Sequence, residues 1–329
     1  MNKTPVACHR AMLAGVLALA QLLVAPIGFS QDYPSKPIRL VVPTSVSTPI
    51  DIVSRIVADR MSAVLGQPIA IDNRPGATGI VGAEEVLKHP ADGYTLLTIM
   101  MPMSVGQSIY PNPPFDLRRD FEPVGQTAFS YNVLVVHPSV PANSVKDLAA
   151  LMKAQPGKLN FCSGGTGTPA HIAGELFKQQ TGTDALHVPY NQYPQAIGDL
   201  LSGQNQFMFT ATPPVIGHIA SGKLRALAVT GPRRIGALKD VPTMIEAGYP
   251  DFVVRDWQGF VVRTGAPRGV ITRVNAAIAT ALASREVTQM FDKLGADPAA
   301  GSPETFAQLI AAEVERWGKL ARAVNIRVQ

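Results

Sequence analysis

The fold is decided by the stretch Ile38-Arg39-Leu40-Val41-Val42-Pro43-Thr44-Ser45-Val46-Ser47-Thr48-Pro49, which joins an apolar strand, a loop of small residues and a helix start. Threonine is a good N-cap, because its side-chain oxygen accepts a hydrogen bond from an otherwise unpaired helix N–H. Proline fits the first helical position, where its missing N–H costs nothing. The pattern predicts a helix over residues 49–65 whose positive N-terminal end faces the space beyond the strand.

The same pattern occurs a second time, 120 residues further along the chain. A strand ending at Cys162 is followed by a glycine-rich loop and by Thr168-Pro169, which start a helix over about residues 169–180. We call residues 43–47 the first loop and residues 163–167 the second loop. In α/β sheets, ligands lie beyond the carboxyl ends of the strands. Two helix N-termini facing each other there predict a two-sided anion site.

Apolar runs alternate with amphipathic helical patterns along the rest of the chain. Strands are predicted over residues 38–42, 69–71, 95–99, 132–136, 159–161, 207–210, 227–229 and 259–262. Further helices are predicted over residues 79–88, 145–154, 193–202, 215–221, 270–284, 286–294 and 303–324. This order favours mostly parallel sheets with helices on both faces. The length favours two α/β lobes over a single core.

Residues 1–30 resemble an export signal. Lys3 and Arg10 precede an apolar run over residues 11–25, and Gly28-Phe29-Ser30 is an acceptable cleavage site. A membrane anchor fits less well, because this run is shorter than the roughly 18 residues that a span needs. We therefore expect a cleaved signal peptide and a soluble protein in the periplasm of a Gram-negative bacterium.

Composition excludes several classes of protein. The formal net charge is +5 and falls to about +3 without Lys3 and Arg10, which is too mild for a nucleic-acid partner. Cleavage also removes Cys8 and leaves Cys162 as the only cysteine, so no disulfide is expected. We expect no cofactor and no metal, because a third ligand beside His171 and Glu175 is missing at typical spacing.

Several short motifs follow one another in a characteristic order along the mature chain. They include Asn73-Arg74-Pro75-Gly76-Ala77-Thr78-Gly79, Asp92-Gly93-Tyr94-Thr95-Leu96, Gly167-Thr168-Pro169-Ala170-His171, His187-Val188-Pro189-Tyr190 and Val241-Pro242-Thr243-Met244-Ile245-Glu246-Ala247-Gly248. Together they resemble the Bug, or TctC-type, extracytoplasmic solute receptors of tripartite tricarboxylate transport systems. The resemblance implies a type II periplasmic binding-protein fold, with two α/β lobes, crossover strands and a ligand cleft between the lobes. It also implies lobe 1 at residues 31–131 and 253–329, and lobe 2 at residues 132–252.

The resemblance further implies a solute-binding receptor and not an enzyme. Such a receptor captures a small carboxylated ligand between its lobes and delivers it to the membrane components of a tripartite tricarboxylate-type transporter. We expect a monomer. A ligand sensor that docks on a membrane signalling protein is the alternative. A periplasmic enzyme using Cys162 or Ser163 is less favoured: a helix N-terminus beside Cys162 can lower a thiol pKa, but Gly-x-Ser-x-Gly is missing.

Family members hold a ligand carboxylate with backbone N–H groups, hydroxyls and waters of the two loops. The candidate ligand-binding residues are therefore Ser45, Ser47, Thr48, Asp51, Ser104, Ser163, Gly164, Gly165, Thr166, Gly167, Thr168, Tyr190 and Thr210. For Asp51 a capping box, reaching back to the Thr48 N–H, is favoured over ligand contact. The Tyr190 hydroxyl either faces the cleft or belongs to a half-buried tyrosine. For His171 we favour a packing or cap-supporting role, and for Trp257 packing at the hinge.

The departures from the family pattern bear on specificity. Ser47 and Thr48 stand where the family's first loop, Pro-Phe-Pro-Pro-Gly-Gly-x-x-Asp, has its paired glycines. Thr210 stands where a carboxylate that can pair with a ligand amine is frequent, and Asn191 where a basic residue is common. Methionines at residues 100–103 predict an adaptable, apolar pocket wall. We therefore expect a monocarboxylate or an otherwise uncharged ligand, and not a tricarboxylate.

Overall fold

The computed structural model describes residues 33–190 and 192–326. The chain divides into a short N-terminal unit, Met1–Ser35, and one compact unit, Lys36–Gln329, to which the following description applies. The predicted signal peptide and Asn191 lie outside the described residues. Among the helices of the described part, none is both long enough and apolar enough to cross a membrane.

The elements alternate between strands and helices, as the sequence predicts. In chain order they are β1 (Ile38–Val42), α2 (Pro49–Leu65), β2 (Ile69–Asn73), η1 (Ala77–Gly79), α3 (Ile80–Leu87), β3 (Thr95–Met100), α4 (Met101–Ile109), β4 (Phe121–Val136), α5 (Val145–Ala154), β5 (Asn160–Ser163), α6 (Pro169–Thr181), β6 (Leu186–Pro189), α7 (Tyr193–Leu201), β7 (Phe207–Ala211), α8 (Ile216–Ala220), β8 (Arg225–Val229), η2 (Gly236–Leu238), β9 (Arg255–Arg263), α9 (Arg268–Leu282), α10 (Arg285–Leu294), β10 (Ala296–Pro298) and α11 (Pro303–Ala323). Each predicted strand and helix has a counterpart. The sequence analysis missed α4, β6, β10 and the first half of β4.

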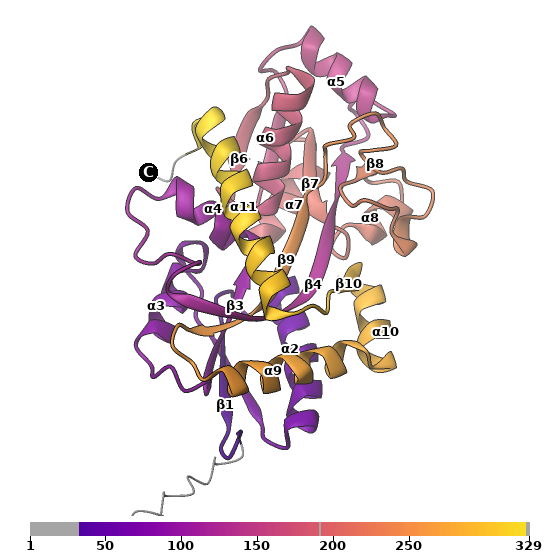
Figure 1. Ribbon diagram of the computed structural model, residues 1–329. Coiled ribbons are helices and arrows are strands. Elements are labelled where there is room, and N and C mark those ends of the chain that lie inside the picture. Colours follow the sequence, from indigo (N-terminus) through magenta and orange to yellow (C-terminus); the bar gives the residue numbers. More distant parts are fainter. Residues whose placement is uncertain (1–32, 191, 327–329) are drawn as a thin grey trace, which may run out of the picture. The chain divides into compact units, whose positions relative to one another are not determined.

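Two groups of strands share the long strand β4. In the first group β1 pairs in parallel with β2 and β3, and in the second β5 pairs in parallel with β6 and β7. Strands β4 and β9 are antiparallel to their neighbours, so the prediction of mostly parallel sheets is right only within each group. β4 pairs with β9 as far as Tyr131 and with β7 from Asn132 onward. Figure 1 shows α2, α9 and α10 around the first group and α5 to α8 around the second.

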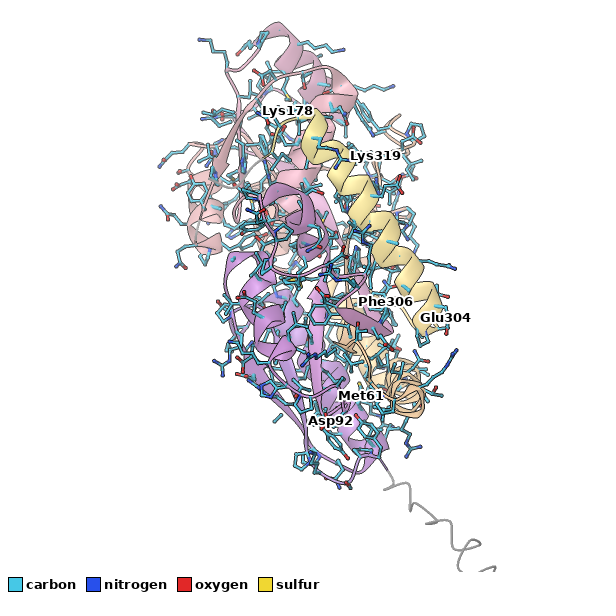
Figure 2. All side chains as sticks on the ribbon, turned by 60° about the vertical axis from the view of Figure 1, so that its left-hand side comes forward. Met61, Asp92, Lys178, Glu304, Phe306 and Lys319 are labelled. Atoms are coloured by element: carbon cyan, nitrogen blue, oxygen red, sulfur yellow. The ribbon has the colours of Figure 1, made fainter. Side chains whose placement is uncertain are left out.

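The helix α11 fastens the connecting strand β9. The indole of Trp257 on β9 is 1% exposed and donates to Glu313 Oε2 at 2.9 Å, and Trp317 donates to the same oxygen at 2.7 Å. The Trp257 ring also meets Phe306 edge-on, with 5.8 Å between ring centroids. Figure 2 shows α11 running from Phe306 to Lys319. Lys319 lies next to α6. Trp257 is therefore a packed core residue of β9, and its place at a hinge stays a prediction.

Candidate ligand-binding site

The first loop ends in the predicted N-cap. The Thr48 hydroxyl accepts a hydrogen bond from the Asp51 N–H at 3.3 Å. The same hydroxyl lies 3.0 Å from the Ser45 carbonyl and 2.8 Å from Thr44 Oγ1. The Ser45 and Ser47 residues are exposed, and Ser47 has the left-handed φ of +65°. A residue with a Cβ thus occupies a backbone conformation that favours glycine.

Asp51 is enclosed by its own group of elements. It is 1% exposed and accepts hydrogen bonds from Arg55 Nε at 3.0 Å, Asn73 Nδ2 at 2.8 Å and the Ser47 N–H at 2.8 Å. The predicted return bond to the Thr48 N–H is wrong by one residue, because the loop turns at Ser47. Burial alone would raise the pKa of Asp51, but the hydrogen bonds from Arg55 and Asn73 outweigh it and lower the pKa. The structural role favoured for Asp51 accounts for all of these contacts.

The second loop is built around a buried serine. Ser163 is fully buried, and its hydroxyl accepts from the Gly165 N–H at 3.1 Å and lies 2.7 Å from His187 Nε2. The Thr168 hydroxyl donates to the Gly165 carbonyl at 2.7 Å. Gly164 lies against the ring of Tyr193, since a Cβ there would be 2.9 Å from Tyr193 Cδ2.

A histidine supports the second helix start. Thr168 occupies the N-cap position of α6 but makes no side-chain capping bond, so the predicted threonine cap is wrong here. His171 Nδ1 instead accepts the Gly167 N–H at 3.1 Å, which confirms the favoured cap-supporting role. The Thr168 hydroxyl does not cap α6 because it donates to the Gly165 carbonyl of the loop instead.

His171 and His187 form a stacked pair beneath the second loop. Their ring centroids are 3.9 Å apart, and His187 also stacks on Phe161 at 4.8 Å. Burial, together with the positive charge of Lys178, lowers the pKa of His171 to about 3 and that of His187 to about 4. Both rings are therefore neutral at pH 7, as the acceptor role of His171 Nδ1 requires. Among the described residues no group of three or more His, Cys, Asp or Glu side chains is arranged to hold a metal ion.

The two proposed nucleophiles are placed as structural groups. Cys162 is fully buried, and burial raises the pKa of its thiol to about 12, so the lowering that a helix N-terminus can cause does not occur here. The contact between Ser163 and His187 resembles a nucleophile beside a base. However, Ser163 is inaccessible and its hydroxyl is engaged with Gly165, while the lowered pKa of His187 makes it a weak base.

Three further candidate residues have their hydroxyls engaged by neighbours. The Tyr190 hydroxyl donates to Asp199 Oδ2 at 2.7 Å and accepts from Asn205 Nδ2 at 2.9 Å. The Ser104 hydroxyl donates to the Met101 carbonyl at 2.6 Å inside α4. The Thr210 hydroxyl is hydrogen-bonded to the Tyr193 hydroxyl.

The methionines after β3 belong to the core. Met101 and Met103 lie in the first turn of α4, with at most 2% of each exposed, so the predicted pocket wall is wrong. Met103 packs against Gly79 of η1. Proline at the second position of α4 was the helix signal that the sequence analysis missed.

The second loop packs on the first group of elements. A Cβ on Gly167 would lie 2.8 Å from Ile109 Cδ1, 3.7 Å from Val105 Cγ1 and 4.0 Å from Thr78 Cγ2. Thr78 is a residue that the sequence analysis did not assign to the site, although it lies in a family motif. Its hydroxyl is 3.1 Å from that of Tyr110. The second loop, α4 and η1 thus meet at one place.

A polar group on β9 was also missed. Gln258 Nε2 lies 3.5 Å from the Ile50 carbonyl and 3.4 Å from Ser54 Oγ, at the start of α2. In the described part of the chain, Asp256 Oδ1 and Thr212 Oγ1 are buried side-chain oxygens without a hydrogen-bond partner. No sequence pattern distinguished Gln258 and Asp256 from the other residues of β9.

Comparison with known proteins places this geometry in a family. Residues 53–326 match the model of the tripartite tricarboxylate transporter family receptor, TctC. The chain belongs to this family. Its relatives include the protein BugT of Bordetella pertussis, with 34% identity over 317 residues, 96% of this chain and 97% of BugT.

Solved structures agree with this membership. The periplasmic binding protein BugD is 30% identical with a TM-score of 0.78, covering 90% of this chain and all of BugD. Rpa4515 of R. palustris, solved with adipate, is 33% identical with a TM-score of 0.80, covering 90% of this chain and 99% of that one. The TctC chain described here therefore has the two-lobe fold of periplasmic binding proteins and belongs to a family of solute receptors, not enzymes.

Proposed function

We propose that this protein is a periplasmic receptor that binds a small carboxylated ligand between the first and second loops. It would deliver this ligand to the membrane components of a tripartite tricarboxylate transporter, as the family description implies. The observation that carries the proposal is the contact of Gly167 with α4 and Thr78. This contact supports a site in which helix N-termini from two groups of elements act on one anion.

The domain organisation and export belong to the same proposal. Lobe 1 would comprise residues 31–131 and 253–329, and lobe 2 residues 132–252. The change of partner along β4, from β9 at Tyr131 to β7 at Asn132, supports the first boundary. We also propose cleavage of residues 1–30 on export to the periplasm, and a monomeric receptor.

The ligand groups on this chain would be uncharged. The proposed contacts are the exposed Ser45 and Ser47, the Thr48 hydroxyl and the backbone N–H groups of Gly164 and Thr166, because the N–H groups of Gly165 and Gly167 are bonded to Ser163 and His171. Neither loop contains Lys or Arg, and the nearby Arg55 is bound to Asp51. A tricarboxylate would bring three negative charges without a partner cation, whereas one carboxylate suits two helix N-termini.

A thermal-shift screen of the mature protein tests this function. Carboxylates, amino acids, aromatic acids and amides are compared at the same concentration. A ligand at 100 times its Kd adds about 2.7 kcal/mol, which raises the Tm by a few degrees. We expect one or more carboxylates to do so, and Cys162→Ser to respond equally. A response to amides alone, or tight binding of citrate without any response to monocarboxylates, would contradict the proposal.

A further inference from the structure

Asp256 lies on the face of β9 that faces the start of α2. Side chains two residues apart on a strand share a face, so Asp256 lies on the same face as Gln258. Gln258 reaches the Ile50 carbonyl and Ser54 in the first turns of α2. Asp256 pairs with Ser130 on β4, immediately before that strand changes its partner. It therefore lies at the junction of the two groups of elements, beside the first helix N-terminus.

In the second group of elements, Tyr193 at the start of α7 is the side chain to consider beside Asp256. The Tyr193 ring lies against Gly164 of the second loop, and its hydroxyl is hydrogen-bonded to Thr210. Thr210 pairs with Val133 on β4, three residues beyond Ser130, which pairs with Asp256. Asp256 thus lies between the start of α2 on one side and the pair of Tyr193 and Thr210 on the other.

The carboxyl group of Asp256 has an unmet hydrogen-bonding need. Its Oδ1 is buried without a hydrogen-bond partner among the described residues, while the residue as a whole is only partly buried. Arg255, the preceding residue, lies over the Phe129 ring at 4.8 Å on the other face of the strand. Burial alone raises the pKa of Asp256 to about 7. An unpaired buried carboxyl is unfavourable in a folded protein unless something else satisfies it.

The charges around the site indicate what that partner is. Residues 43–48, 163–168 and 189–193 contain neither Lys nor Arg, so no cation there would compensate a second carboxylate on the ligand. An ammonium group would satisfy Asp256 and balance its charge. Asp256 would then supply, from β9, the carboxylate that Thr210 on β7 lacks.

We propose that Asp256 is a ligand-binding residue that accepts hydrogen bonds from an ammonium group, so that the receptor takes an amino-carboxylate zwitterion. The carboxylate of the ligand lies at the helix N-termini that follow the two loops. The ammonium group of the ligand lies next to the Asp256 carboxylate. This inference rests on the proposed carboxylate receptor and adds the chemistry of the ligand's other end.

Calorimetry with matched ligands tests the inference. For each chain length from three to six carbons, the ω-amino acid is compared with the diacid and the unsubstituted monoacid, using the mature wild-type protein, Asp256→Asn and Asp251→Asn. Asp251 is an exposed carboxylate close by in the sequence and serves as the matched control. A charge-assisted hydrogen bond predicts that the best amino acid binds roughly 10- to 100-fold more tightly than its monoacid. In Asp256→Asn we expect the amino acid to lose its advantage over the monoacid, while Asp251→Asn keeps the preference.

The contrary outcomes separate the two proposals. A wild-type preference for diacids, or an amino-acid preference that survives in Asp256→Asn, overturns the role of Asp256 but leaves a carboxylate receptor. Failure of all three ligand classes to bind the wild type overturns the proposed function and the inference with it. Thermal unfolding of Asp256→Asn verifies the fold, which we expect to be at least as stable as the wild type because no hydrogen bond of Oδ1 is lost.

Discussion

The first loop exposes its serines, whereas the second loop packs against α4, a helix of the first group of elements. Thr48 and Asp51 hold the first loop through contacts within its own group of elements, and Ser45 and Ser47 remain exposed. In the second loop Ser163 is buried and Gly167 packs against Ile109. Two helix starts with the same sequence pattern therefore differ in how they are supported. The second loop is the preformed half of the proposed site, and the first is the half in which side chains can vary.

Acid pH should affect the second loop most. The pKa values of His171 and His187 are lowered to about 3 and about 4 in the folded state, so the unfolded chain binds these protons more readily. Their stability contribution is full above pH 6.5 and is lost as pH falls toward the folded-state values. At pH 5 we expect a loss of up to about 2 kcal/mol for each histidine.

Urea unfolding of the wild type at pH 7.5 and pH 5 measures this loss. His187→Gln should lose about 2 kcal/mol less than the wild type between the two pH values. His218→Gln, which changes a histidine in α8, is the control and should behave like the wild type. Equal pH dependence in all three proteins would show that the buried pair does not titrate as described.

Gly167→Ala should separate the second loop from α4. Gly167 has φ +81°, and the added Cβ would lie 2.8 Å from Ile109 Cδ1, which is itself buried. Gly182→Ala is the matched control, since Gly182 has φ +61° with open space around its Cβ. Overpacking predicts that Gly167→Ala loses roughly 1–3 kcal/mol more than Gly182→Ala. Equal losses in denaturant unfolding would mean that the loop is not pressed against α4.

The two threonines at the helix starts should differ in their contribution to stability. Thr48→Val removes a capping bond and should cost about 1 kcal/mol. Thr168→Val removes only a bond to the Gly165 carbonyl and leaves the His171 cap in place, so about 0.5 kcal/mol is expected. Chemical denaturation of both variants measures the difference, and a larger loss for Thr168→Val would reverse the comparison.

Ser47→Gly is expected to change the free energy of unfolding only slightly. Serine at φ +65° is strained, whereas glycine adopts this conformation freely but loses more backbone entropy on folding. The net expectation is a gain of about 0.5 kcal/mol in the free energy of unfolding. A clear loss of stability would show that the Ser47 side chain has a structural role.

The sequence predicted those features that local physics controls. The helix starts at Pro49 and Pro169 follow from threonine, proline and the apolar stripes behind them. Asp51 as a capping residue follows from its spacing to Thr48, but its contacts with Asn73 join parts of the chain that only the folded sheet brings together.

Other parts of the site depend on distant contacts that no local pattern encodes. His171 replaces the threonine cap because His187 and Phe161 stack beneath it. The burial of Met101 and Met103 depends on η1 and α11 packing over α4. In the sequence Asp256 resembles any strand residue, and only the pairing of β9 with β4 shows that it lies close to the point where β4 changes its partner.

Hydrogen–deuterium exchange of the mature protein tests the central claim, that one ligand engages both loops. Exchange is compared without ligand and with the carboxylate that raises the Tm most. The account predicts slower amide exchange in residues 44–51 and in residues 163–171 at the same ligand concentration. Slowing confined to one of these segments, or absent from both while the Tm rises, would contradict it.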